Sequence, residues 1–187
     1  EGAERIAGQR AGFGADLGAE KFFDIKCRMG GLNPEAAVVV ATIRALKMHG
    51  GVKKDALGTP NVAALKVGMA NLEGHVRNVQ KFGEPVVVAV NRFLSDAPEE
   101  IEAVISAAKS WGARVAMSDV WAKGGAGGEE VANEVLAVLG EKKGKFKPIY
   151  DAAKPIKEKI ETIVREIYGA DGVDYTPEAA AKIEQFT

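Results

Sequence analysis

Two uninterrupted apolar runs, at residues 36–43 and 85–91, constrain the fold of this chain more than any other feature of its sequence. Both runs are rich in valine and alanine. A strand with one face in water alternates apolar and polar side chains, whereas a strand buried on both faces of a parallel sheet has a continuous apolar run. The two runs therefore predict an α/β fold with a mainly parallel sheet at its centre.

The segments that follow these runs predict helices that cross over the sheet. Apolar residues recur every three or four positions from Val62 to Phe82, as on the buried face of an amphipathic helix, and Gly83 ends the pattern. Asp96 and Glu99 predict a capping box at the start of a second helix. This alternation of strands and helices is typical of a three-layer arrangement, in which crossover helices pack on a parallel sheet.

A third strand and a third helix complete the expected pattern. Residues 113–120 predict a strand nearer the edge of the sheet, because Arg114 and Ser118 alternate there with apolar residues. A glycine-rich loop at residues 124–128 then leads into a helix that ends near Gly140.

The chain divides into three parts by composition. Residues 1–35 form a glycine-rich lead-in in which no regular structure is expected, residues 36–142 the α/β domain, and residues 143–187 a small helical C-terminal lobe. In this lobe Thr176 and Pro177 predict the N-cap and the first turn of the last helix.

Composition narrows the functional classes. The 187 residues carry 25 Lys and Arg against 26 Asp and Glu, so the net charge of −1 gives no electrostatic reason to expect nucleic acid or an anionic membrane as a partner. One cysteine, Cys27, excludes a disulfide scaffold, and an apolar share of 47% excludes a disordered chain. No apolar run reaches the roughly 18 to 20 residues of a membrane span. A reducing cytoplasm is the expected location.

The residues that follow the three strands are unusual in their chemistry. Arg44, Lys47 and His49 follow the first strand, Phe93 follows the second and Trp121 the third. The carboxyl ends of parallel strands share one edge of the sheet, where ligands bind. Phe93 and Trp121 are therefore expected to hold a flat heterocycle between them, since stacked aromatic pairs contribute about 0.5 to 1.5 kcal/mol beyond area burial. The roles of the three basic residues stay open.

Each aromatic residue also has a purely structural alternative. Phe93 precedes a capped helix and fits a hydrophobic staple, whereas Trp121 fits an anchor that pins its loop to the body of the protein. Some other chemistries are excluded. The two histidines and the one cysteine give no zinc spacing, and residues 140–146 lack both the spacing and the Ser or Thr of a phosphate-binding P-loop.

Four blocks of the sequence occur in the same order in a known enzyme family. They read AGFGADLGAEKFFDIKCR at 11–28, VATIRALKMHGG at 40–51, VVAVNRF at 87–93 and VWAKGGAGG at 120–128. On these blocks the chain resembles formate–tetrahydrofolate ligase, also called formyltetrahydrofolate synthetase. The last block looks more like the bacterial single-function enzymes than the eukaryotic trifunctional ones.

The resemblance implies an ATP-dependent ligase that joins formate to tetrahydrofolate and gives 10-formyltetrahydrofolate through formyl phosphate. It also implies ATP with Mg²⁺, a monovalent cation such as K⁺ or NH₄⁺, and a cytoplasmic homotetramer. The aromatic pair that holds folate in the family matches Phe93 and Trp121, and Met117 and Ser118 match a stretch that lines the same cleft.

Other parts of the family's pattern have no counterpart in this sequence. These are the P-loop with its lysine and an arginine that holds formyl phosphate, so the catalytic residues stay unassigned. The expectation is a middle-to-late fragment of the ligase that keeps much of the folate side and is inactive alone. Two alternatives stay open: a free-standing α/β module that binds a nucleotide or small molecule, and a non-catalytic assembly domain whose Phe93 and Trp121 are buried against a partner.

Overall fold

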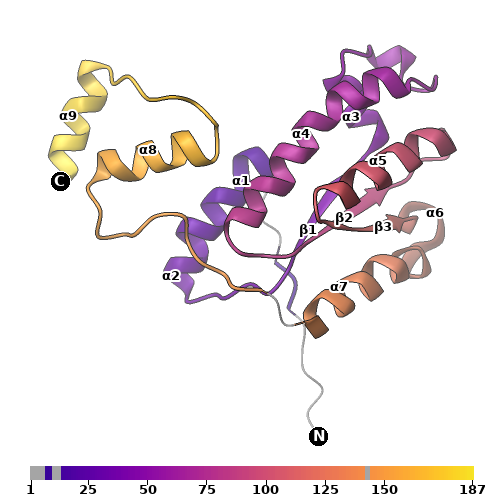
Figure 1. Cartoon of the computed structure of the whole chain (residues 1–187), viewed down its shortest axis with the longest axis horizontal. Coiled ribbons are helices and arrows are strands. Elements are labelled where there is room, and N and C mark those ends of the chain that lie inside the picture. The colour runs from indigo at the N-terminus through magenta and orange to yellow at the C-terminus, as the bar shows by residue number, and fades with distance from the viewer. Residues whose placement is uncertain (1–6, 10–13, 142–143) are drawn as a thin grey trace, which may run out of the picture.

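A computed structural model describes residues 7–9, 14–141 and 144–187 of the chain. Within these residues a parallel sheet of three strands, in the order β1-β2-β3, lies at the centre (Figure 1). The strands are β1 (Ala37–Ala41), β2 (Val86–Asn91) and β3 (Arg114–Ser118). Each lies within a run that predicts a strand, and the parallel pairing confirms the α/β fold.

One face of the sheet is covered by the helices of the crossover connections. They are α3 (Ile43–His49), α4 (Val62–Lys81) and α5 (Pro98–Ser110). The apolar stripe of α4 is buried, with Leu65 and Val76 at 0% exposure, and it joins Val88 of β2 and Val104 of α5 in the main hydrophobic core. The burial of this stripe confirms the helix that the sequence predicts between the first two strands.

The opposite face of the sheet is covered by α7 (Glu129–Glu141) (Figure 1). Its Val138 lies in a second core cluster with Val87 of β2 and Ala116 of β3. Successive side chains of a strand point to opposite faces, so Val87 and Val88 are buried on different sides of the sheet, both at 0% exposure. Strand β2 is therefore buried on both faces as predicted, and the three-layer architecture is confirmed.

Strand β1 contradicts the prediction that it is buried on both faces. Val39 and Ala41 face the main core, but Val38 and Val40 are 45% and 65% exposed. The cause is tertiary, because β1 lies at the edge of the sheet and the main sheet contacts of α7 are with β2 and β3. An apolar run does not show by itself which of its faces a helix covers.

The segment before β1 is helical at residues 15–30, so the expectation of an irregular lead-in is wrong there, whereas residues 7–9 and 32–36 have no helix or strand. It contains α1 (Ala15–Lys21), the π-helical turn η1 (Phe22–Cys27) and α2 (Arg28–Gly30). Phe23 and Cys27 are buried, and the Phe23 ring packs on Phe82 at the end of α4, with 4.6 Å between the ring centroids. This tertiary packing stabilises the helices. Residues 1–6 and 10–13 of the lead-in lie outside the described residues.

Helix α5 starts one residue later than the predicted capping box places it. The N-cap residue is Ala97, and Glu100 rather than Glu99 accepts a hydrogen bond from the Ala97 N–H, at 3.4 Å. Asp96 instead closes the preceding loop, where its Oδ2 accepts a hydrogen bond from the Phe93 N–H at 2.9 Å. The acidic side chains of this segment thus order both the loop and the start of the helix.

A C-terminal lobe follows the irregular residues 144–155. It contains α8 (Ile156–Glu166) and α9 (Pro177–Phe186), and Figure 1 shows both helices away from β3 and α7. Thr176 Oγ1 accepts a hydrogen bond from the Ala179 N–H at 3.2 Å, which confirms the predicted N-cap. The lobe contacts α4 through the Asn78 side-chain amide, which donates a hydrogen bond to the Ile167 carbonyl oxygen at 3.0 Å.

Candidate functional site

The strands β2 and β3 end side by side at one edge of the sheet. Asn91 pairs with Ser118 in the parallel register, and the Arg92 N–H donates a hydrogen bond to the Ser118 carbonyl oxygen at 3.0 Å. Phe93 follows the end of β2 by two residues, and Trp121 follows the end of β3 by three. The two aromatic residues therefore leave the sheet at neighbouring points of its carboxyl edge, as the parallel order of the strands predicts.

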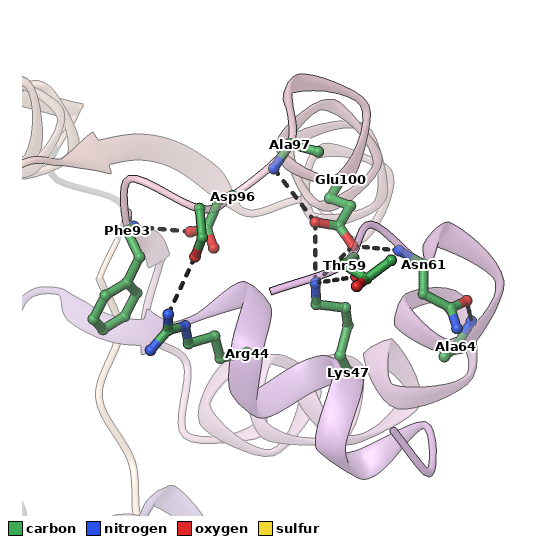
Figure 2. Close-up of polar contacts among 10 residues, drawn as sticks. Arg44, Lys47, Thr59, Asn61, Ala64, Phe93, Asp96, Ala97 and Glu100 are labelled. Carbon is green, nitrogen blue, oxygen red and sulfur yellow. Dashed lines mark hydrogen bonds and ion pairs between the residues drawn. The ribbon is translucent and has the colours of Figure 1, made fainter. Parts of the chain in front are cut away.

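The backbone of Phe93 forms hydrogen bonds within its loop, and the ring of Phe93 contacts a cationic side chain. Its carbonyl oxygen accepts the Asp96 N–H at 3.0 Å, in addition to the bond from its own N–H to Asp96. The Arg44 guanidinium of α3 lies 4.8 Å from the centroid of the Phe93 ring (Figure 2). It also donates a hydrogen bond to Ser95 Oγ at 3.2 Å. An exposed cation–π contact of this kind contributes about 0.5 to 1 kcal/mol. The structure thus places Arg44 beside Phe93, and the half-buried ring keeps part of its surface open.

Trp121 lies on a short helical segment, which replaces the expected glycine-rich loop. The segment contains α6 (Val120–Lys123) and the 3-10 turn η3 (Gly124–Gly128). The Trp121 side chain is 77% exposed, which argues against the alternative that it pins its loop to the protein body. The segment folds back because the Gly127 carbonyl oxygen accepts the Asp119 N–H at 2.9 Å. A Cβ at Gly127 would lie 2.4 Å from the Asp119 carbonyl oxygen, so this close approach requires glycine.

Asp119 forms ion pairs with two cationic side chains near Trp121 in the sequence, Arg92 and Lys123. Its Oδ2 lies 3.7 Å from Arg92 Nη1 and 3.0 Å from Lys123 Nζ. Partly exposed ion pairs contribute little to stability. The two cations balance the negative charge of Asp119, and the Arg92 pair links the residue after β2 to the residue after β3.

Met117 and Ser118 occupy the last two positions of β3. Met117 is half-buried and packs against the main core, so it contacts the helical layer that contains α4 and α5. Ser118 is half-buried at the carboxyl edge, where its carbonyl oxygen accepts the Arg92 N–H. Of the two candidate cleft residues, Ser118 thus lies at the same edge as Phe93 and Trp121.

Lys47 lies in the protein interior. Its side chain has 0% exposure, its Nζ lies 3.0 Å from Glu100 Oε1, and it donates a hydrogen bond to the Thr59 carbonyl oxygen at 3.1 Å (Figure 2). Glu100 also accepts the Asn61 N–H at 2.7 Å. Burial by itself raises the pKa of Glu100, but hydrogen bonds from Asn61, Lys47 and Ala97 outweigh burial and hold this pKa below its ordinary value.

Glu100 is the residue of this region that sequence reasoning missed. A signal existed, because Glu100 lies in the first helical turn two residues after Pro98, where a carboxylate can accept free N–H groups. Glu99 carries the same signal one position earlier. Only the contact with Lys47, which is 53 residues away in the chain, distinguishes the two.

His49, the third basic residue after β1, ends α3 and is exposed. A cationic side chain in the last helical turn interacts favourably with the helix dipole. None of the ring–ring contacts within the described residues joins Phe93 to Trp121. The two rings therefore do not stack on each other.

Metal-binding clusters and membrane-spanning helices are both absent from the described part of the chain. There, no group of three or more His, Cys, Asp or Glu side chains gathers as a metal site requires. In the same residues, no helix combines the length and the apolar character needed to cross a membrane.

Comparison with known protein families gives a match over nearly the whole chain. The family described as formate--tetrahydrofolate ligase matches residues 6–187. The matched range includes the whole carboxyl edge of the sheet, from Arg44 to Trp121.

Proposed function

The chain belongs to the formate–tetrahydrofolate ligase family, and from this premise we propose that it supplies the tetrahydrofolate-binding side of the enzyme. The proposed reaction joins formate to an amine of tetrahydrofolate with consumption of ATP, and it gives 10-formyltetrahydrofolate through formyl phosphate. One observation supports this assignment most. Phe93 and Trp121 lie at neighbouring strand exits, where one ring is half-buried and ordered and the other is 77% exposed.

The two aromatic residues suit the flat ring systems of tetrahydrofolate. Phe93 is ordered by Asp96 and Arg44 before any ligand binds, so little side-chain entropy is lost on stacking. The exposed Trp121 removes apolar surface from water when it packs on a ligand, at about 25 cal/mol per Å². Holding the substrate from two sides orients its reacting amine and shields formyl phosphate from water.

The residues of this chain do not form a recognisable binding loop for the phosphates of ATP. The sequence has no loop that combines the glycine spacing of a P-loop with its Lys and its Ser or Thr. ATP with Mg²⁺, when bound, would supply the phosphoryl group that activates formate, and no step through them is assigned to these residues. We extend the proposal to a homotetramer that needs K⁺ or NH₄⁺, because the family resemblance implies both.

Tryptophan fluorescence tests the proposed site. Trp111 is half-buried and packs against the main core, so a Trp111→Phe background leaves Trp121 as the reporter. We expect tetrahydrofolate to quench this emission. Phe93→Ala should weaken the affinity roughly 2- to 12-fold, because it removes one stacked aromatic contact. Leu94→Ala, a control at an adjacent side chain that is 83% exposed, should leave the affinity unchanged.

Three outcomes would contradict parts of this proposal. Quenching of full amplitude in Trp121→Ala, with Trp111 retained, would show that tetrahydrofolate does not contact Trp121. A lower molar mass of Trp121→Ala in light scattering, with unchanged tetrahydrofolate affinity, would favour the assembly alternative. ATP-dependent formation of 10-formyltetrahydrofolate by the 187-residue chain would show that the nucleotide side is present in it.

A further inference from the structure

The buried ion pair between Lys47 and Glu100 joins three elements at the edge where the proposed tetrahydrofolate site lies. Lys47 belongs to α3, and Glu100 belongs to the first turn of α5. Asn61, whose N–H donates to Glu100, is the N-cap residue of α4. Both charged side chains have 0% exposure, so neither contacts solvent.

Stability alone does not account for this pair. Removing two charges from water is costly, and apolar residues of similar volume often make a chain equally stable or more stable. The costs are offset here because Lys47 also donates to the Thr59 carbonyl oxygen, and Glu100 accepts two backbone N–H groups. The charged groups add orientation. Hydrogen bonds are directional, so they define the position of α3 relative to α5 more specifically than apolar contacts do.

This fixed arrangement reaches Phe93 along α5. Glu100 accepts the N–H of Ala97, the N-cap residue. Asp96, the preceding residue, holds Phe93 through two hydrogen bonds of the loop. The first turn of α5 and the Phe93 loop are therefore one continuous hydrogen-bonded unit.

The same arrangement reaches Phe93 along α3. Arg44 lies three residues before Lys47, about one helical turn, and its guanidinium covers the Phe93 ring (Figure 2). A rotation or shift of α3 relative to α5 would move this cation off the ring. The Lys47–Glu100 pair is a direct charged link between the two helices, so it opposes such a movement.

We propose that Lys47 and Glu100 are positioning residues for tetrahydrofolate binding, because their buried ion pair holds Arg44 against Phe93 and so orients the Phe93 ring for stacking. This inference rests on the proposed function, in which tetrahydrofolate stacks on Phe93. The two residues act only through Phe93, since both are fully buried. A ring that is oriented in advance binds a flat ligand with a smaller ordering cost.

A double-mutant cycle with Phe93 tests the proposal in the 187-residue chain. Lys47→Met/Glu100→Leu removes both charges of the pair, so neither is left buried without its partner. We expect this variant to keep its circular dichroism spectrum and to bind tetrahydrofolate about 3- to 10-fold more weakly in calorimetry. In a Phe93→Ala background the same double substitution should cause no further loss, because the pair acts through Phe93. A general structural role would cause the same loss in both backgrounds.

The matched control is Arg77→Gln/Glu73→Gln, which removes an exposed ion pair of α4 and should leave the affinity unchanged. Glu100→Gln keeps an oxygen for the Asn61 N–H and replaces the double variant if that variant does not fold, with the same expected loss. A folded variant with unchanged affinity overturns the proposal, and so does an additive loss in the Phe93→Ala background. If Phe93→Ala alone leaves the affinity unchanged, the proposed function itself is overturned.

Discussion

Glu84, just before β2, is buried at 2% exposure, and neither of its carboxylate oxygens has a hydrogen-bond partner among the described residues. Burial and, to a smaller extent, the charge of Glu35 raise the pKa of Glu84 from 4.5 to about 7. The carboxyl group is therefore protonated in the folded protein at mildly acidic pH, and its ionisation at higher pH is costly. Burial also raises the pKa of Asp24 to about 7.

The free energy of unfolding should fall as the pH rises from about 4.5 to 7, because over this range the folded state retains a proton that the unfolded state has lost. We expect Glu84→Gln to weaken this pH dependence, leaving the contribution of Asp24. The substitution should stabilise the protein at pH 8 by on the order of 2 to 3 kcal/mol. Urea unfolding at pH 5 and pH 8 measures both effects. Glu130→Gln on the exposed side of α7 is the control, and an equal profile in both variants would refute the prediction.

Helices α3 and α4 approach each other closely at Gly68. A Cβ at this position would lie 1.8 Å from the Leu46 carbonyl oxygen of α3. That oxygen accepts the Gly50 N–H at 3.0 Å, so it cannot move away without breaking the end of α3. The contact between the two helices therefore requires a residue without a side chain at Gly68.

Gly68→Ala should destabilise the protein by about 1 to 3 kcal/mol, which is the usual cost of overpacking, although alanine favours a helix more than glycine does. Gly74→Ala in the same helix is the matched control, since no atom lies within 4 Å of the added Cβ. This control should stabilise the protein by about 0.5 to 1 kcal/mol. Thermal unfolding followed by circular dichroism compares the two, and shifts of the same sign would contradict the close approach of α3 and α4.

At the scale of the whole molecule, the most consequential feature is strand β1, which has an unpaired outer edge and an exposed apolar face among the described residues. This strand has no neighbour on its outer edge among the described residues, and residues 37–41 contain no Lys and no Pro. Val38 and Val40 expose an apolar face beside that edge. Edge strands without charges or bulges pair readily with other chains. We expect the 187-residue chain to self-associate through β1 at high concentration.

Val40→Lys should lower this association in dynamic light scattering and change the melting temperature little, because the side chain is already 65% exposed. Val67→Lys is the matched control, since Val67 is 67% exposed on α4 and lies on no sheet edge. This control should leave the association unchanged. Equal association in the two variants would assign it to a surface other than β1.

The sequence by itself determined the parallel sheet, the helix from Val62 and the edge that carries Phe93 and Trp121. Each rests on a local pattern: continuous apolar runs indicate strands, a three-to-four residue period indicates a helix, and the carboxyl ends of parallel strands share an edge. The tertiary structure decided which positions of these patterns are buried. Val40 and Val87 lie in similar valine runs, yet only Val87 is covered by α7.

The same reason applies at the candidate site. Arg44 and Lys47 lie on one short helix, yet Arg44 is exposed over Phe93 whereas Lys47 is fully buried against Glu100. Glu99 and Glu100 are adjacent, yet only Glu100 meets that lysine. Burial, charge state and pairing depend on groups that are distant in the chain and close in space. A one-dimensional pattern therefore determines which element a residue belongs to, and only the packing of the elements decides what its side chain contacts.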